Sequence, residues 1–364
     1  MSNKIKILHI IPIYTTGGAE RLVLHYARLL DKDKYEIHVA SCVEDGELRE
    51  KFEKLNNIHV YVGSRTKDGG RLKAYGKLWQ YTKDIQPDII HTHILAADFF
   101  GFFVKLKLGK KIKWISTQHN VEASTSTLRK ILWRFILKFA DSVVAVSKSV
   151  EKFTIDNFKV KKEKCELLLN GIDTENWLKV PLNKLFTHDK IQLASVGRLW
   201  EQKGHTYLLQ ALSKLNFVFE LHLFGDGPLR ERLELEAKNL QINDNIVWHG
   251  VTPNVVDYMR DIDIVIQASL WEGLSLVVME MMSSGRVVVA TPPAGEELMV
   301  DQKTGYLVPS KNSVKLAEKL VYIVENREEA KAVALEARKV AKENFDIMKN
   351  VQGLENIYDK LAKN

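Results

Sequence analysis

Short apolar runs alternate with amphipathic segments along the first half of the chain. The segments between the runs carry apolar residues at three- and four-residue spacing, which is typical of helices that cover a sheet. The runs are almost continuously apolar, as expected of parallel strands that are buried on both faces. We predict strands at residues 5–13, 35–42, 58–62, 88–93, 113–118 and 142–147. The pattern therefore indicates a series of βαβ units.

The same alternation resumes after a turn-rich stretch at residues 171–188, which we interpret as a linker. The strands expected in this second series are 190–197, 219–225, 245–250, 263–269 and 286–291. The tail from about residue 314 has a helical, charged pattern. A chain of 364 residues exceeds what one hydrophobic core usually supports. We predict an α/β protein with two doubly wound domains, residues 1–180 and 181–345.

Composition narrows the class of protein. The apolar fraction of 45% and the charged fraction of 27% are ordinary for a globular protein. No run reaches the roughly 18 apolar residues that span a bilayer. Lys6 and His9 interrupt the N-terminal apolar run, so it fits a buried strand better than a signal peptide. Cys42 and Cys165 lack a disulfide framework or metal-ligand spacing, and we expect a cytoplasmic protein.

The net charge of +7 is concentrated in residues 101–140, where nine lysines and arginines accompany one acid, Glu122. Such a patch predicts an anionic partner. Within it, residues 128–140 combine four cations and Trp133 with apolar residues at helical spacing, which are Leu132, Phe135, Ile136 and Phe139. A helix on the anionic inner face of a membrane and a helix that covers the sheet explain this pattern equally well. Nucleic acid is disfavoured because no aromatic platform for bases is organised there.

Ligands of open parallel sheets bind beyond the carboxyl ends of the strands, so two such domains predict a cleft between those ends. In the first half, Gly17 and Gly18 follow the first strand, where glycine amides at a helix start suit an anion or form a simple turn. His91 and His93 lie on one face of the fourth strand, and packing explains them better than a metal does. His119 ends the fifth strand, where a neutral imidazole suits a sugar hydroxyl or a structural hydrogen bond.

In the second half, Arg198 and Lys203 flank the turn after the first strand. Both cations are predicted to converge on one anion, because arginine offers a planar fork for phosphate and lysine a mobile charge. Two further glycine loops, at residues 224–228 and 248–251, also follow strands and belong to the same sheet edge.

The stretch 271–285 is the most informative. Glu272 is expected in a loop and Glu280 on a helix that begins near Ser275. Unpaired amide groups of Leu274, Ser275 and Leu276 would then form a seat for phosphate. Carboxylates on both sides of that seat suit hydroxyl groups, and a ligand with hydroxyls beside a phosphate is a nucleotide sugar.

Two Asp-x-Asp elements, at residues 31–33 and 261–263, resemble the metal-binding element of some sugar transferases. One lies where a helix ends and the other opens a strand, so we interpret both as structural. Arg198, Lys203 and helix amides can neutralise a diphosphate without a cation. We therefore expect no metal and no cofactor.

Taken together, these motifs resemble glycosyltransferase family 4, which comprises retaining enzymes of the GT-B fold with two Rossmann-like domains. The resemblance covers nearly the whole chain. It rests on Gly17 and Gly18, on the NGID at residues 170–173, on the GRLWEQKG at 197–204 and on the Glu272–Glu280 pair, in the family's order and spacing. The sequence departs from the pattern at Arg286, where members commonly carry a proline or another small residue, and in a shorter loop at 294–299.

The resemblance implies a role for each matched residue. Arg198 and Lys203 would hold the donor diphosphate, and Glu280 the ribose hydroxyls. Glu272 would meet the donor sugar together with the amides that follow it, and His119 would contact the sugar near its 6-position. Gly17 and Gly18 would approach the diphosphate, and residues 346–364 would form a helix that returns to the first domain. The full set of expected donor-binding residues is Gly17, Gly18, Val251, Gly273, Leu274, Ser275, Leu276 and Glu280.

The predicted activity is transfer of a sugar, with retention of configuration, from a nucleotide-sugar donor to a saccharide or lipid-linked saccharide. UDP is the preferred base because it is frequent in the family. No carboxylate other than Glu272 could act as a nucleophile under the sugar, which favours a front-face reaction in which the leaving phosphate helps to deprotonate the acceptor. The alternatives are an epimerase of GT-B fold, an anion- or nucleic-acid-binding protein that uses the basic patch, and a dehydrogenase. The chain lacks the dinucleotide fingerprint that a dehydrogenase needs.

Overall fold

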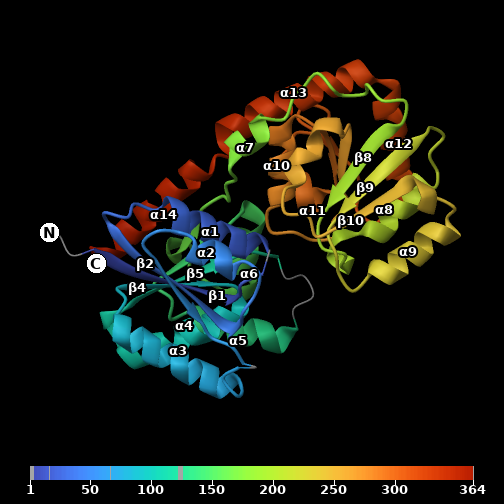
Figure 1. Ribbon diagram of the computed structural model, residues 1–364. Coiled ribbons are helices and arrows are strands. Elements are labelled where there is room, and N and C mark those ends of the chain that lie inside the picture. Colours follow the sequence, from blue (N-terminus) through green and yellow to red (C-terminus); the bar gives the residue numbers. More distant parts are fainter. Residues whose placement is uncertain (1–3, 16, 66, 122–125, 364) are drawn as a thin grey trace. The chain divides into compact units, whose positions relative to one another are not determined.

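The computed structural model describes residues 4–15, 17–65, 67–121 and 126–363 (Figure 1). The chain divides into two compact units. The first unit comprises Met1–Gly171 and Ile347–Asn364, and the second comprises Ile172–Asp346. The boundary between the two units therefore lies after Gly171, and not after residue 180 as we expected.

The first unit is built on a parallel sheet of seven strands in the order β3-β2-β1-β4-β5-β6-β7. Its strands are β1 (Ile5–Ile13), β2 (Tyr35–Glu44), β3 (Ile58–Val62), β4 (Ile89–His93), β5 (Lys113–Gln118), β6 (Ser142–Ala145) and β7 (Cys165–Leu167). The register of β1 and β4 places His9 opposite His91. The doubly wound order confirms the predicted architecture, and β7 is a short strand that the pattern missed.

Helices cover both faces of this sheet (Figure 1). They are α1 (Gly18–Leu29), α2 (Arg49–Glu53), α3 (Arg71–Ile85), α4 (Leu95–Leu108), α5 (Thr127–Leu137), α6 (Lys148–Phe158) and α14 (Ile347–Ala362), with the short 3₁₀ helices η1 (Gly109–Lys111) and η2 (Lys162–Lys164). The last helix, α14, packs Val351, Leu354 and Tyr358 into the same core as α1. The end of the chain therefore completes the first unit.

The second unit has a parallel sheet of six strands in the order β10-β9-β8-β11-β12-β13. Its strands are β8 (Ile191–Val196), β9 (Phe219–Phe224), β10 (Ile246–Gly250), β11 (Ile264–Gln267), β12 (Val287–Ala290) and β13 (Tyr306–Leu307). Its helices are α7 (Thr174–Leu178), α8 (His205–Leu212), α9 (Arg230–Asn239), α10 (Leu276–Ser284), α11 (Pro292–Gly295), α12 (Ser313–Glu325) and α13 (Arg327–Asn344), with η3 (Glu201–Lys203), η4 (Asn243–Asn245), η5 (Val255–Asp257) and η6 (Met259–Asp261). This sheet is also doubly wound, as predicted.

Most of the stretch that we interpreted as a linker is an ordered part of the second unit. It contains α7, and Trp177 and Val180 are buried in the core. Arg338 on α13 donates to the carbonyl of Val180 at 2.7 Å, and Arg286 donates to that of Pro181 at 2.7 Å. These hydrogen bonds satisfy carbonyls of a segment that has few apolar residues, which explains why hydrophobic periodicity alone did not place it.

Candidate functional site

Three glycine loops meet at the carboxyl ends of β8, β9 and β10. The amide of Gly197 donates to the carbonyl of Phe224 at 2.9 Å, and the amide of Gly225 donates to that of Gly250 at 2.7 Å. Gly225 has a φ of +135°, and a Cβ there would lie 2.0 Å from the carbonyl oxygen of Gly197. Only glycine allows so close a backbone approach. The loops that the sequence placed along one edge of the sheet are therefore joined into one surface.

Lys203 and Glu272 form an ion pair at this edge. The Nζ atom of Lys203 lies 2.5 Å from Oε1 of Glu272, and the side chains are 16% and 9% exposed. Ser269 donates to the same carboxylate oxygen at 2.9 Å. A tight turn at Gly204, with a φ of +65°, brings η3 against the loop after β11. The sequence did not predict this pair, because Lys203 was assigned only to an anionic ligand.

Arg198 occupies the turn directly after β8, and its guanidinium lies over the ring of Trp200 at 5.3 Å. Its side chain is exposed. Among the ion pairs of the described residues, none includes Arg198, so its charge is available to an anion. Arg198 and Lys203 thus share one strand–helix turn, as expected, but Lys203 already has an acidic partner within the protein.

Helix α10 begins at Leu276, after the N-cap Ser275, whose hydroxyl accepts a hydrogen bond from the amide of Val278 at 3.4 Å. The expected start near Ser275 is therefore correct. The first amide groups of a helix have no partner within the helix, so the Leu276 end of α10 presents donors and a positive dipole end. Such an end suits a phosphate group.

Glu280 is 2% exposed although it lies in the middle of α10. Val278, Met279, Met281 and Met282 around it are buried in the core of the second unit. The apolar surroundings that singled out Glu280 in the sequence therefore reflect a helix that is buried on most sides. An ordinary surface glutamate is excluded. A carboxylate in such surroundings is kept only where polar partners offset the cost of its burial.

The remaining residues expected at the donor site have varied surroundings. Val251 directly follows β10 and is 70% exposed. Gly273 is buried in the loop between Glu272 and α10. In the first unit, Gly17 is the N-cap of α1 with a φ of −87°, and Gly18 begins that helix. Gly17 therefore does not use the positive φ that glycine allows. A Cβ at Gly17 would lie 2.2 Å from a carboxylate oxygen of Glu20, so a larger residue there would require the Glu20 side chain to move.

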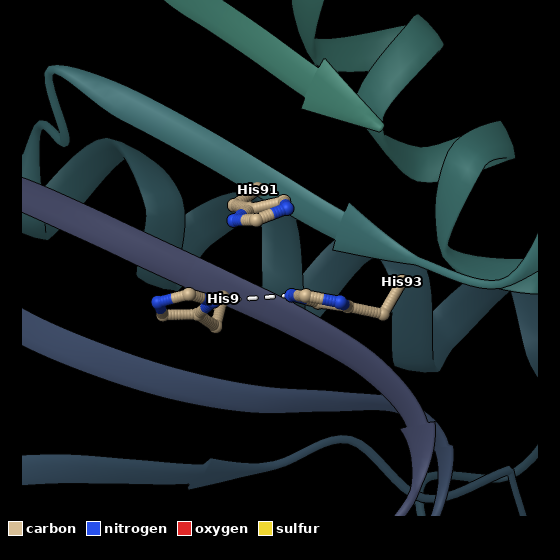
Figure 2. A group of neighbouring side chains, drawn as sticks. All are labelled: His9, His91 and His93. Carbon is tan, nitrogen blue, oxygen red and sulfur yellow. Dashed lines mark hydrogen bonds between the residues drawn. The ribbon is translucent and has the colours of Figure 1, made fainter. Parts of the chain in front are cut away.

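Three histidines lie together on β1 and β4 of the first unit (Figure 2). His9 Nδ1 is 3.1 Å from His93 Nε2, and His93 Nδ1 is 3.2 Å from His119 Nε2. Burial lowers the pKa of His9 to about 3 and that of His119 to about 4, so both rings are neutral at physiological pH. The sequence singled out His91, His93 and His119. It missed His9, which joins them through the pairing of β1 with β4.

Two groups of described residues have ligand atoms close enough for a metal ion. They are His9, His91 and His93, and Glu36, His38 and His59. In the first group both ring nitrogens of every histidine have a hydrogen-bond partner within the protein. In the second, His38 bonds to Glu36 at 2.9 Å and to Tyr81 at 2.7 Å. Internal hydrogen bonds therefore account for the clustering of the histidines in the first group and of His38 in the second.

The second Asp-x-Asp element is structural, as interpreted. Asp263 is fully buried and accepts hydrogen bonds from the backbone amides of Phe186 and Gln192, at 2.5 and 2.8 Å. In the first element, Asp31 accepts a hydrogen bond from the amide of Asp33 at 2.8 Å and thereby closes a turn. Asp263 thus links Phe186 and strand β8 to the residue before β11, whereas the contact of Asp31 is local to the turn between α1 and β2.

The basic stretch contributes one face to the core and another to solvent. On α5, Trp133, Ile136 and Leu137 are buried, so of the two interpretations left open for Ile136 the structure supports packing against the protein. Phe102 on α4 contacts Phe135 and Phe139, which joins the two helices. The exposed apolar residues of this surface are Phe103, Leu106, Leu128, Ile131, Leu132 and Phe135. Its exposed cations are Lys107, Lys110, Lys111, Arg129, Arg134 and Lys138.

We call these twelve residues the α4–α5 surface. Lys105 does not belong to it, because its ammonium group pairs with Asp141 at 2.6 Å. None of the described helices combines the length and apolar character needed to cross a membrane. The α4–α5 surface is therefore a mixed basic and apolar area on the helical layer.

Comparisons with known proteins assign both units. Residues 16–176 match the family model Glycosyltransferase Family 4, and residues 182–340 match Glycosyl transferases group 1. An N-acetylgalactosamine-N,N'-diacetylbacillosaminyl-diphospho-undecaprenol 4-alpha-N-acetylgalactosaminyltransferase of Campylobacter jejuni is 31% identical over 92% of this chain and 94% of its own. A UDP-Gal:alpha-D-GlcNAc-diphosphoundecaprenol alpha-1,3-galactosyltransferase of Escherichia coli is 21% identical over 100% of this chain and 98% of its own.

Solved structures show the same fold. HepE of Anabaena, in complex with UDP and glucose, superposes with a TM-score of 0.86 at 21% identity, over 98% of this chain and 100% of its own. A glycosyltransferase of Rickettsia africae superposes with a TM-score of 0.83 at 23% identity over the whole of both chains. Both likenesses confirm the predicted architecture of two Rossmann-like units.

Proposed function

Since this chain is a member of glycosyltransferase family 4 with the GT-B fold, we propose that it transfers a sugar from a UDP-sugar, with retention and without a metal ion. The observation that carries the proposal is the edge of the second sheet. There the guanidinium of Arg198, which takes part in no ion pair of the described residues, the ion-paired Lys203 and the start of α10 follow strands β8 and β11.

The proposed donor contacts follow from the charges at this edge. Arg198 supplies a planar fork for a diphosphate, and Lys203 supplies a second cation that Glu272 and Ser269 hold in place. The amides of Leu274, Ser275 and Leu276 add neutral donors. Glu280 accepts hydrogen bonds from the ribose. The backbone at Gly273 and at Val251 lies beside the nucleotide. For the first unit we propose that His119 binds a hydroxyl of the donor sugar and that the amides at Gly17 and Gly18 bind phosphate.

The donor base and the acceptor are proposed from the relatives. HepE was solved with UDP and glucose, and the Escherichia coli relative is named for UDP-galactose. The relatives from Escherichia coli and Campylobacter jejuni are both named for acceptors on diphospho-undecaprenol. We therefore propose a UDP-sugar donor and a saccharide on a lipid diphosphate as the acceptor.

Retention is proposed to proceed on one face of the sugar. The carboxylate of Glu272 is held by Lys203 and Ser269, which suits hydroxyl binding better than nucleophilic attack. The acceptor oxygen then forms its bond to the anomeric carbon as the bond to the UDP oxygen breaks. The acceptor proton passes to the leaving phosphate. Arg198, Lys203 and the α10 amides stabilise the charge that develops on that phosphate, which is the work a metal ion does in other transferases.

A thermal-shift screen in EDTA tests the donor proposal. UDP-sugars should raise the melting temperature, because a ligand at a hundred times its Kd adds about 2.7 kcal/mol to the folded state. GDP- and ADP-sugars serve as matched controls and should raise it less. Stabilisation that requires added Mg²⁺ or Mn²⁺ would contradict metal independence. Product analysis with a lipid diphosphate saccharide completes the test, because free UDP and an altered sugar formed without the acceptor would instead indicate an epimerase.

For the α4–α5 surface we propose contact with an anionic lipid bilayer, at the cytoplasmic face where such an acceptor would be reached. Exposed apolar side chains beside six exposed cations are suited to the headgroup region. The cations are worth about 1 kcal/mol each near an anionic surface. Trp133 and Ile136 pack against the protein, whereas the exposed residues of α5 face solvent. The helix can therefore pack on the protein and contact a bilayer at the same time.

Co-sedimentation with vesicles tests the surface. Binding should require phosphatidylglycerol, and replacing Lys107, Lys110 and Lys111 by glutamine should weaken it on the order of a hundredfold. Replacing Leu128 and Ile131 by serine should also weaken it, whereas Leu235→Ser, at an exposed leucine of α9, should not. Equal binding to neutral vesicles, or equal loss with the α9 control, would rule out this surface.

A further inference from the structure

The segment that leaves β8 places an arginine and a tryptophan on the same side of the chain. The backbone of Trp200 is extended, with a φ of −125° and a ψ of 159°. Side chains two residues apart in an extended segment point to the same side, and the residue between them points to the other. Leu199 is accordingly buried in the core of the second unit, whereas Arg198 and Trp200 are both exposed.

The loop after β9 holds this segment in place. The amide of Leu199 donates to the carbonyl of Asp226 at 2.9 Å, and the carbonyl of Leu199 accepts from the amide of Leu229 at 3.1 Å. The indole lies against the same loop, because a Cβ at Gly227 would lie 2.9 Å from Cδ1 of Trp200. Trp200 is nevertheless 49% exposed. The ring is therefore supported from one side and open to solvent on another.

The Arg198 side chain depends on this ring for its place. Its Cζ atom lies 5.3 Å from the centroid of the Trp200 ring, within the range of about 6 Å in which a ring face attracts a cation. The part of the chain that the structure describes offers it no hydrogen bond and no ion pair. An arginine side chain loses rotamer freedom when it binds a ligand, and this loss opposes binding unless another contact has already restricted the side chain.

We propose that Trp200 is a positioning residue that holds the guanidinium of Arg198 ready for an anion. A guanidinium that lies over a ring uses its face for that contact and keeps N–H groups at its edge for two oxygens of a phosphate. The identity of the anion rests on the proposed function, in which it is the diphosphate of the UDP-sugar. Trp200 then acts through Arg198 and does not contact the ligand.

The first test needs no ligand. It is NMR of protein with ¹³C- and ¹⁵N-labelled arginine, with Arg198→Gln used to assign the Arg198 signals. Protons over the face of an indole are shifted upfield by its ring current, so the side-chain protons of Arg198 should be shifted upfield in the native protein. In Trp200→Leu they should return to the usual arginine positions, and Trp200→Phe should keep part of the shift. The absence of an upfield shift in the native protein overturns the proposal, irrespective of whether the variants fold.

The second test is a double-mutant cycle on UDP binding, measured by calorimetry in EDTA. Trp200→Leu should raise the Kd for UDP about two- to fivefold, which corresponds to the roughly 0.5–1 kcal/mol of an exposed cation–π contact. Trp200→Phe should recover most of this loss, because it restores a ring face. In the Arg198→Gln background, Trp200→Leu should cause no further loss. A loss of equal size in both backgrounds would overturn the proposal, because the indole would then act without Arg198.

Phe186→Leu is the matched control. The ring of Phe186 lies under the guanidinium of Arg327 at 5.7 Å in the same unit. The amide of Phe186 bonds to Asp263, which precedes β11, so this pair lies at the sheet edge opposite to the one that carries Arg198. The variant should leave the Arg198 signals and the Kd for UDP unchanged, and an equal loss of UDP binding in it would overturn the proposal.

The two tests separate this inference from the proposed function. A native protein that binds no UDP contradicts the proposed function, and the Arg198 signals still report whether Trp200 holds the guanidinium. A native protein that binds UDP as tightly as Trp200→Leu does contradicts the role of Trp200 alone.

Discussion

Replacing Arg198 by glutamine should lower kcat/KM for the UDP-sugar by about tenfold to a hundredfold. A hydrogen bond to a charged group contributes about 1.5–3 kcal/mol, and each 1.36 kcal/mol corresponds to a factor of about ten in rate. The loss should appear largely in kcat if Arg198 stabilises charge that develops on the leaving phosphate. The folded state should be little changed, because the exposed guanidinium packs over Trp200 and takes part in no ion pair of the described chain.

The control for this experiment is Arg232→Gln, at an exposed arginine on α9 of the same unit. It removes the same charge from the same domain and should leave turnover unchanged. Melting temperatures of both variants should match that of the native protein. Full turnover in Arg198→Gln would contradict the assignment of the diphosphate site.

Lys203 offers a less direct test of the same site. Its ammonium group and the carboxylate of Glu272 are both mostly buried, at 16% and 9% exposure. Removing either one leaves the other charge without its partner, so an activity loss would mix catalysis with stability. This pairing also explains why Glu272 is kept in a fixed place before any ligand binds. Substitution of Arg198 therefore tests the effect of its charge on catalysis alone, whereas substitution of Lys203 also changes stability.

Hydrophobic periodicity alone was enough to predict the two sheets, because both are buried on both faces. It failed for β7 and β13, which have three and two residues and no periodicity to detect. It also did not predict that Trp133 and Ile136 face the core while Leu128 and Ile131 face solvent. All four are apolar, so only the packing of α5 on its neighbours separates the two groups.

The candidate site was predictable in part for a related reason. Residues that follow strands are brought to one edge by the parallel topology, which correctly placed Lys203 and Glu272 at the same edge as Arg198. The contact between Lys203 and Glu272 depends on the turn at Gly204 and had no signal in the sequence. Likewise, His9 joined the histidine group only through the register of β1 and β4.

Arg286 is one of the positions at which the sequence departs from the family pattern. The structure gives it a structural role. Its side chain is fully buried and donates to the carbonyls of Ile262 at 3.0 Å and Pro181 at 2.7 Å. It also opposes the burial that raises the pKa of Asp263. Arg286 thus links the segment after α7 to the segment before β11, and its charge favours the ionised form of Asp263.

Replacing Arg286 by methionine should lower the free energy of unfolding of the second unit by about 2–6 kcal/mol, because each of two buried carbonyls left without its donor costs about 1–3 kcal/mol. Two carbonyls lose their donor, and Asp263 loses its compensating charge, so the pKa of Asp263 should rise further. A raised carboxyl pKa destabilises the folded state above that pKa, and the penalty fades as the pH falls and the carboxyl is protonated. The difference from the native protein should therefore be smaller at pH 5 than at pH 7.

Urea titrations at both pH values measure this difference, with Arg260→Met, at an exposed arginine of η6, as the control. The control should unfold like the native protein at both pH values. A loss below about 1 kcal/mol in Arg286→Met would show that water replaces the lost donors. A loss that grows as the pH falls would exclude Asp263 as the group that responds. Since Arg286 contacts neither the Lys203–Glu272 pair nor the start of α10 in the described contacts, donor affinity of the variant should stay unchanged at temperatures where it is folded.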